Sequence, residues 1–160
     1  MNAVTPWPRT NPDAGATAGR RGVFRFLRWP LGVAALLAIY PALVLGTVYW
    51  KVQHSEFEGG RNGPRDAYRH TLASAILARS LFPEVVDWVT LVMEHDGHGG
   101  AARAMDAHNN RNGARIGVEA ASWKELDASV LASIRQGRVN ASRPDQSTWL
   151  AADTWSERLY

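Results

Sequence analysis

Apolar residues recur at helical spacing along most of the chain, and no segment shows a convincing strand-like alternation of apolar and polar positions. This pattern predicts an all-α protein. We expect an N-terminal transmembrane helix followed by a compact bundle of about four to five helices, with the bundle formed by residues 64–160.

The helices of the bundle follow from runs of periodic apolar positions bounded by helix-breaking residues. Residues 138–160 are mostly polar with a few aromatic side chains, and we expect one short helix there that docks on the bundle. The longer predicted helices are residues 64–81, 84–95, 101–121 and 123–136.

Capping residues fix two of the helix starts. Asn62 or Gly63 caps the first helix of the bundle, and Pro64 suits its first turn because proline has the helical φ angle and needs no intrahelical N–H bond. Ser122 and Glu125 form a capping-box pattern that predicts the start of the last long helix.

The N-terminal region carries the strongest apolar signal. No charged residue lies between Arg28 and Lys51, and residues 29–50 would span about 33 Å as a helix, close to the thickness of a bilayer core. We therefore predict that residues 23–52 are a transmembrane anchor that contacts the lipid bilayer through residues 29–50. Residues 1–22 lack apolar periodicity and read as a disordered cytoplasmic tail.

Flanking charge predicts the orientation of this anchor. Five arginines precede the apolar run, which favours a cytoplasmic N-terminus in the bacterial inner membrane, with residues 53–160 outside. Residues 53–63, polar and glycine-rich, read as a linker. A cleaved signal peptide fits less well because the apolar core is long and lacks an Ala-x-Ala site. A buried helix of a soluble domain remains an alternative interpretation.

Charge and cysteine content exclude some function classes. The pI is 9.7, but residues 1–51 carry six Lys/Arg and one acid, whereas residues 52–160 carry twelve Lys/Arg and fourteen acids. The basic excess therefore belongs to the N-terminal region, and we expect no nucleic-acid partner for the bundle. The absence of cysteine excludes disulfides and thiolate metal sites.

The candidate chemistry lies in the first predicted helix of the bundle and the segment after it. Four of the five histidines fall between residues 62 and 117. Asp66 and His70 are four residues apart and therefore neighbours on one helix face. Apolar residues cover most of the remaining circumference, so both side chains are expected to point inward.

A second polar run lies in the helix predicted at residues 101–121. Asp106, Asn109, Asn110 and Gly113 follow the i, i+3, i+4, i+7 spacing that normally marks an apolar seam. Buried polar groups without partners cost on the order of 1–3 kcal/mol each, so such a stripe indicates either an internal hydrogen-bond network or a functional site.

These groups suggest a metal site or an acid/base site. His95 lies between the two helices in an acid- and histidine-rich segment, and His70, His95 and Asp106 are candidate metal ligands, with zinc favoured for imidazole and carboxylate donors. The pair Asp66/His70 could equally act as a general base held by its carboxylate. Asn109 and Asn110 would orient a substrate or a ligating carboxylate.

The motifs DAYRH at residues 66–70 and MDAHNNRNG at residues 105–113 resemble an uncharacterised bacterial helical domain with the signature DA[FY]RH … HE … MDxHNNxxG. That domain is similar to modules of secreted or wall-associated proteins, some of them toxin-like. Where it has His-Glu, this chain reads His95-Asp96, or Glu94-His95 in reverse order. The resemblance implies an all-α fold and a polar, hydrolytic type of site, without a substrate.

The resulting functional hypothesis is a membrane-anchored metal-dependent hydrolase that acts in the cell envelope. Asp66, His70, His95, Asp106, Asn109 and Asn110 would be its catalytic residues. The alternative is a non-enzymatic, membrane-tethered binding or structural protein in which the polar stripe is a buried network. An inhibitory partner of a secreted toxin is a third interpretation.

Overall fold

The computed structural model describes residues 32, 38–84, 86 and 100–156. Its chain divides into two units, residues 1–41 and residues 42–160. In the first unit, the described residues 32 and 38–41 are helical. The predicted cytoplasmic tail, residues 29–31 and 33–37 of the predicted membrane span, and nearly all of the helix predicted at residues 84–95 lie outside the described residues.

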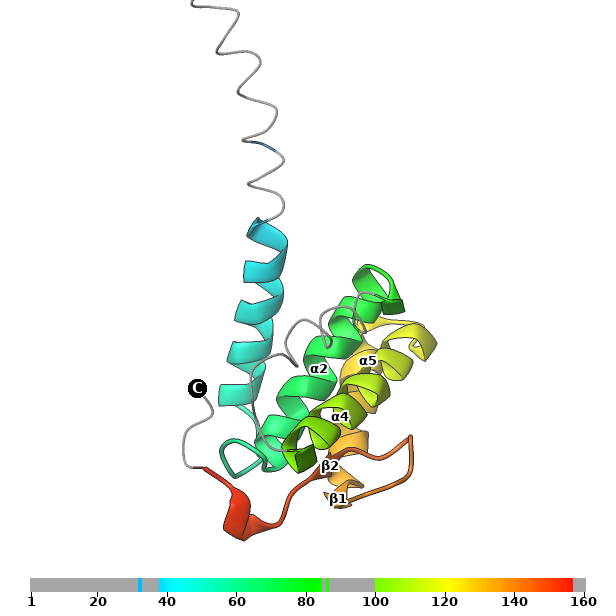
Figure 1. Ribbon diagram of the computed structural model, residues 1–160. Coiled ribbons are helices and arrows are strands. Elements are labelled where there is room, and N and C mark those ends of the chain that lie inside the picture. The colour runs from blue at the N-terminus through cyan, green and yellow to red at the C-terminus, as the bar shows by residue number, and fades with distance from the viewer. Residues whose placement is uncertain (1–31, 33–37, 85, 87–99, 157–160) are drawn as a thin grey trace, which may run out of the picture. The chain divides into compact units, whose positions relative to one another are not determined.

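The second unit is mostly helical, which confirms the predicted helical bundle in outline (Figure 1). Residues 42–53 begin this unit and are helical. The elements that follow are α2 (Pro64–Ser80), α4 (Gly100–Glu119), α5 (Trp123–Arg135), β1 (Arg138–Val139), β2 (Thr148–Trp149) and the 3₁₀ turn η1 (Ala152–Thr154).

Local sequence signals position the helices as expected. Gly63 is the N-cap of α2 and Pro64 its first residue. The hydroxyl of Ser122 accepts a hydrogen bond from the Glu125 amide at 3.1 Å, and the Glu125 carboxylate accepts one from the Ala121 amide at 2.9 Å. These bonds satisfy amides that have no intrahelical partner at the start of α5.

Helices α2 and α4 lie side by side and run in the same direction (Figure 1). Two glycines of α4 permit their close approach. A Cβ atom at Gly113 would overlap the Thr71 carbonyl oxygen, and one at Gly117 would overlap that of Ala75. The glycines therefore set the helix spacing, and this spacing brings the polar residues of the two helices together.

The apolar core includes residues that the sequence placed near a membrane. Val44, Val48 and Val52 are buried at i, i+4 and i+8 on the helix before α2. Lys51 of the same helix pairs with Asp127 of α5 at 2.6 Å. Among the described residues, no helix combines the length and apolar character needed to cross a bilayer.

One face of α5 also contributes to the core. Leu126, Val130 and Ile134 are at most 1% exposed, and Leu72 of α2 is completely buried.

The C-terminal region differs from the prediction. A short helix was expected at residues 138–160, and no strand was expected in the chain. Instead β1 and β2 pair in parallel, with Arg138 opposite Thr148, and η1 follows. Asn140, at φ 52°, turns the chain directly after β1, and tertiary contacts to Thr148 hold β2 in place.

The segment predicted as a linker, residues 53–63, packs against the bundle. The rings of Phe57 and Tyr68 lie 5.2 Å apart, and the Phe57 carbonyl accepts a hydrogen bond from the Arg65 side chain at 3.0 Å. Gly59, at φ 84°, lies against the indole of Trp155, where a Cβ atom would be 2.8 Å from the ring. Polar composition concealed these contacts because backbone groups and the rings of three aromatic residues make them.

Candidate functional site

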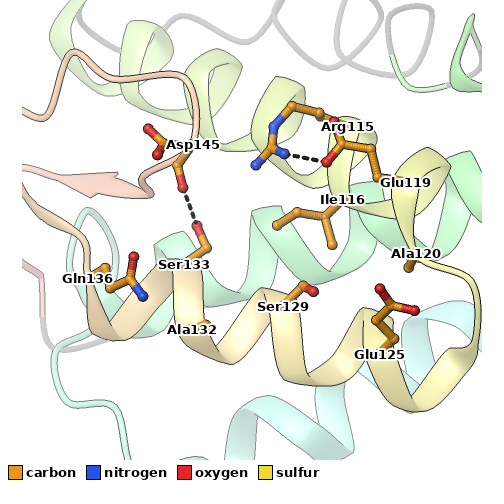
Figure 2. Close-up of a pocket in the computed structure, with 10 residues that line it drawn as sticks. All are labelled: Arg115, Ile116, Glu119, Ala120, Glu125, Ser129, Ala132, Ser133, Gln136 and Asp145. Carbon is orange, nitrogen blue, oxygen red and sulfur yellow. Dashed lines mark hydrogen bonds and ion pairs between the residues drawn. The ribbon is translucent and has the colours of Figure 1, made fainter.

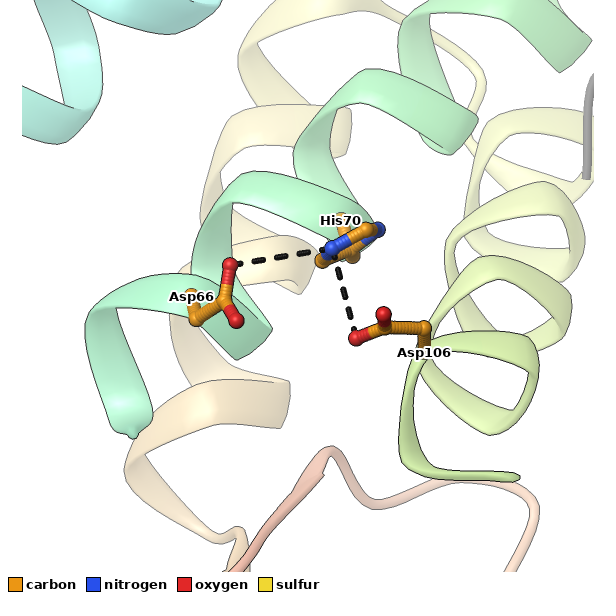
Figure 3. A group of neighbouring side chains, drawn as sticks. All are labelled: Asp66, His70 and Asp106. Atoms are coloured by element: carbon orange, nitrogen blue, oxygen red, sulfur yellow. Dashed lines mark ion pairs between the residues drawn. The ribbon is translucent and has the colours of Figure 1, made fainter. Parts of the chain in front are cut away.

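Side chains from α2 and α4 converge at Asp66, His70 and Asp106 (Figure 3). The Nε2 atom of His70 lies 3.6 Å from Oδ1 of Asp66 and 3.3 Å from Oδ1 of Asp106. One potential ligand atom from each of the three residues lies within 4.8 Å of the other two. The structure thus brings together three of the six predicted site residues around one point.

Asp66 is held rigidly by its surroundings. It is 1% exposed, and its Oδ2 atom accepts a hydrogen bond at 2.8 Å from the backbone amide of Asn62. Asn62 has a positive φ of 68°, a conformation that asparagine tolerates better than most residues. The Asn62 contact fixes one carboxylate oxygen in the turn before α2, so that the other, Oδ1, faces His70.

The orientation of His70 is set through Asn110. Nδ1 of His70 lies 3.3 Å from Oδ1 of Asn110, which also accepts a hydrogen bond from the Ser74 hydroxyl at 3.0 Å. Because an amide oxygen only accepts hydrogen bonds, this contact places a proton on Nδ1. In the neutral ring, Nε2 then carries the lone pair, as a metal ligand or a general base requires, and it accepts a hydrogen bond from the Arg69 guanidinium at 3.0 Å. Asn110 therefore orients the imidazole. The sequence had instead suggested that Asn110 would orient a substrate or a ligating carboxylate.

Asp106 forms the accessible side of the cluster, since its side chain is 36% exposed. Partial burial raises the pKa of the Asp106 carboxyl above its ordinary value, His70 opposes this rise, and the charge of Asp66 adds to it. The Oδ1 atoms of Asp66 and Asp106 are both buried. Within the described residues, that of Asp66 lies 2.6 Å from the Arg69 guanidinium, whereas that of Asp106 accepts no hydrogen bond. Two such oxygens facing one imidazole nitrogen form an environment suited to a cation.

The raised pKa of Asp106 predicts a pH-dependent effect of the Asp106→Asn change in metal-free protein. A folded-state pKa above the unfolded value means that folding favours the protonated carboxyl, so Asp106 loses stabilisation as pH rises through its folded pKa. Asparagine does not ionise. We expect the variant to gain stability relative to wild type as the pH rises from about 4, the ordinary pKa of the carboxyl, towards neutrality. Urea denaturation with chelator across this range measures it, and a relative loss would contradict the assigned burial effect.

The spacing of the three ligand atoms fits a metal ion. Ligands about 2.1 Å from a common ion are separated by about 3.0 Å at octahedral cis positions, 3.4 Å in a tetrahedron and 4.2 Å at trans positions. The two separations from His70 Nε2, 3.3 and 3.6 Å, fall in this range. One imidazole and two carboxylates can hold several divalent ions, and this donor set does not select zinc.

Two predicted site residues do not join the cluster. His95 lies outside the described residues, so its role as a ligand stays a prediction. Asn109 is completely buried and turned towards β2, where its amide donates to the Thr148 carbonyl at 2.8 Å and accepts from the Thr148 amide at 2.9 Å. These two bonds use the amide to hold β2 against α4, a structural role. The predicted stripe thus divides, because Asp106, Asn110 and Gly113 face α2.

A buried hydroxyl network accompanies Asn109, and the sequence did not reveal it. Ser147 lies at its centre, 3.2 Å from the Thr71 hydroxyl, 2.9 Å from the Ser133 hydroxyl and 3.2 Å from the Asn112 amide. These residues come from α2, α4, α5 and the segment before β2. Serine and threonine at isolated positions give no periodic signal, so only the tertiary contacts identify them.

The molecule also contains a pocket of about 300 Å³ between α4 and α5 (Figure 2). Arg115 and Glu119 form an ion pair at 2.5 Å in its wall, and Ser133 and Asp145 close one end. Asp66, His70 and Asp106 do not line it. The pocket is therefore separate from the cluster that carries the candidate chemistry.

Comparison with known proteins adds no further identification. The chain matches no model of a protein family, and no curated protein or solved structure is significantly similar to it. The resemblance to the DA[FY]RH domain family remains a prediction, and the function must be inferred from the site itself.

Proposed function

We propose that Asp66, His70 and Asp106 bind a divalent metal ion and that this centre catalyses hydrolysis. The observation that carries the proposal is the convergence of two buried carboxylate oxygens on the lone-pair nitrogen of one histidine. Burial and the repulsion between two carboxylates this close raise the pKa of Asp106, and metal coordination would remove that cost.

The three side chains have distinct roles in this proposal. Asp66 is the buried, fixed ligand, His70 is oriented from behind by Asn110, and Asp106 lies towards solvent. Three protein ligands leave coordination positions for water, and a divalent ion lowers the pKa of bound water enough to form a nucleophile near neutral pH. The predicted membrane anchor and outward orientation favour lipid or cell-wall substrates in the envelope.

Metal content of the full-length protein, purified without chelator, tests the proposal. We expect about one divalent ion per chain by mass spectrometry, and its loss in His70→Ala and Asp106→Asn. His108→Ala is the matched control, because His108 also lies on α4's polar surface but contacts the Gln146 carbonyl at 2.8 Å rather than the cluster. Absence of metal from wild type after supplementation with zinc, manganese and cobalt would refute the metal centre.

Hydrolysis is assayed separately on the metal-loaded protein. We expect turnover of a phospholipid or peptidoglycan preparation by wild type and the His108→Ala variant. The Asp106→Asn variant is expected to lose at least about 100-fold in rate, because the loss of a ligand removes the metal that would supply the nucleophilic water. Stoichiometric metal without turnover of either preparation would keep the metal site and reject these envelope substrates.

A structural network is the second candidate, and one observation favours it. Arg69 pairs with Asp66 at 2.6 Å, so part of the carboxylate charge is already neutralised within α2. If the cluster only joins α2 to α4, His70→Ala should lower the melting temperature of the protein and added metal should have no effect. A functional site predicts the reverse, with metal at 100 times its Kd stabilising wild type by about 2.7 kcal/mol.

A further inference from the structure

Arg69 lies on the atoms proposed to bind the metal. One of its terminal guanidinium nitrogens is 2.6 Å from Oδ1 of Asp66 and 3.0 Å from Nε2 of His70. These are two of the three candidate ligand atoms. The arginine is the neighbour of His70 in α2, and its side chain is 21% exposed.

The geometry prevents simultaneous occupancy by the metal and this nitrogen. The two ligand atoms are 3.6 Å apart. An ion about 2.1 Å from both would lie within about 3.2 Å of the guanidinium nitrogen at every position around the line that joins them. Two cations at this separation repel strongly, because the surrounding protein screens them less than water does. The guanidinium must therefore leave before the ion can bind.

We propose that Arg69 is the resident cation of the metal-free site, that the metal ion displaces it, and that the displaced guanidinium then binds an oxyanion of the substrate. This inference rests on the proposed metal centre and adds its substrate class. In the metal-free state the arginine neutralises Asp66, which is 1% exposed and would otherwise be a buried unpaired charge.

Displacement leaves the guanidinium next to the metal with its donors directed outward. A planar guanidinium binds phosphate and carboxylate groups through paired hydrogen bonds, and a metal ion polarises the same groups. Arg61 adds positive charge near Asp106, since it lowers the pKa of that carboxyl. The combination of metal, Arg69 and Arg61 suits an anionic substrate, with phosphate esters as the best match in charge and geometry.

Affinity for Mn²⁺ tests the displacement step, measured on the full chain by electron paramagnetic resonance of the free ion. We expect Arg69→Gln to bind Mn²⁺ roughly tenfold or more tightly than wild type, because the competing cation is gone. Arg69→Lys retains a competing cation and should stay within about threefold of wild type. Arg111→Gln is the control for general loss of positive charge, since Arg111 is an exposed residue of α4 and is not among the charges that shift the pKa of Asp106, and we expect less than about threefold change.

The outcomes separate this inference from the proposed function. If wild type binds Mn²⁺ and Arg69→Gln binds it equally or more weakly, the displacement is refuted and the metal centre stands. If neither protein binds Mn²⁺, both fail. Should the glutamine variant not fold, nitrogen NMR of arginine-labelled wild type decides. The guanidinium signal of Arg69 is the one that is absent from the spectrum of Arg69→Lys. Adding Zn²⁺ to wild type should shift this signal, and an unchanged spectrum under saturating Zn²⁺ would refute the displacement.

Inorganic phosphate tests the oxyanion step. At a concentration of Mn²⁺ that saturates each protein, we expect calorimetry to show phosphate binding to wild type and at least about fivefold weaker binding to Arg69→Gln. Without metal, wild type should bind phosphate weakly, because the guanidinium is engaged with Asp66. Equal phosphate affinity for the two metal-loaded proteins would refute the assignment of Arg69 as the oxyanion-binding group.

Discussion

Replacing Gly113 with alanine is expected to destabilise the bundle by about 3 kcal/mol or more, or to prevent folding. The added Cβ would overlap the Thr71 carbonyl oxygen and lie 2.9 Å from the Ser74 Cβ. Because a backbone carbonyl of α2 is in the way, no rotation of a side chain relieves the clash, and the two helices must separate. Urea denaturation followed by circular dichroism measures the loss.

Gly100→Ala is the matched control on the same helix. Gly100 begins α4, and no atom lies within 4 Å of the position of an added Cβ. Alanine has the higher helix propensity, so we expect unchanged or slightly increased stability. Similar urea midpoints for the two variants would show that α4 does not approach α2 as closely as described. In any Gly113→Ala protein that folds, metal affinity should also fall, because α2 and α4 each supply ligands.

The second large effect is expected for Asn109→Ala. This change removes both hydrogen bonds to Thr148 and leaves a buried carbonyl and a buried amide of β2 without partners. At about 1–3 kcal/mol for each group, we predict a loss of about 2–5 kcal/mol in unfolding free energy. Hydrogen exchange should show faster exchange in residues 147–149 before global unfolding, because β2 depends on this amide.

Asn110→Ala provides the comparison for this prediction. It is the same residue type at the next position, but it is only partly buried and contacts His70 and Ser74 instead of a strand. We expect a stability loss below about 1.5 kcal/mol together with weaker metal binding, because His70 loses its orienting partner. If Asn110→Ala destabilised the protein as much as Asn109→Ala, the separation of the stripe into a structural and a functional part would be wrong.

The two asparagines show that one helix, α4, performs two tasks. One side, with Asn109 and Asn112, binds the segment around β2 and the serine network of α5. Another side, with Asp106 and Asn110, faces the polar residues of α2. The glycine contacts lie between the C-terminal parts of α2 and α4. A substitution on either side of α4 is expected to alter metal affinity, although only the side with Asp106 and Asn110 contacts the proposed metal ligands.

The sequence by itself determined the helical class and the bounds of α2 and α5, and it singled out Asp66, His70 and Asp106 as candidate site residues. These features depend on local rules. Capping residues at Gly63 and Ser122 act within one turn, and the four-residue spacing of Asp66 and His70 requires only that the helix forms. The polar stripe on α4 was recognisable because its positions normally hold apolar side chains.

Only the tertiary structure decided which polar residues meet. Asn109 and Asn110 are adjacent and chemically identical, yet one binds β2 and the other orients His70, because helix rotation and partner position separate their directions by about 100°. Three other features likewise depend on contacts between segments distant in sequence or on side-chain direction. They are the packing of residues 53–63, the pairing of β1 with β2 and the contact of Arg69 with the proposed ligand atoms. Spacing along the chain contains no information about such contacts, and only the packing of α2, α4 and α5 supplies it.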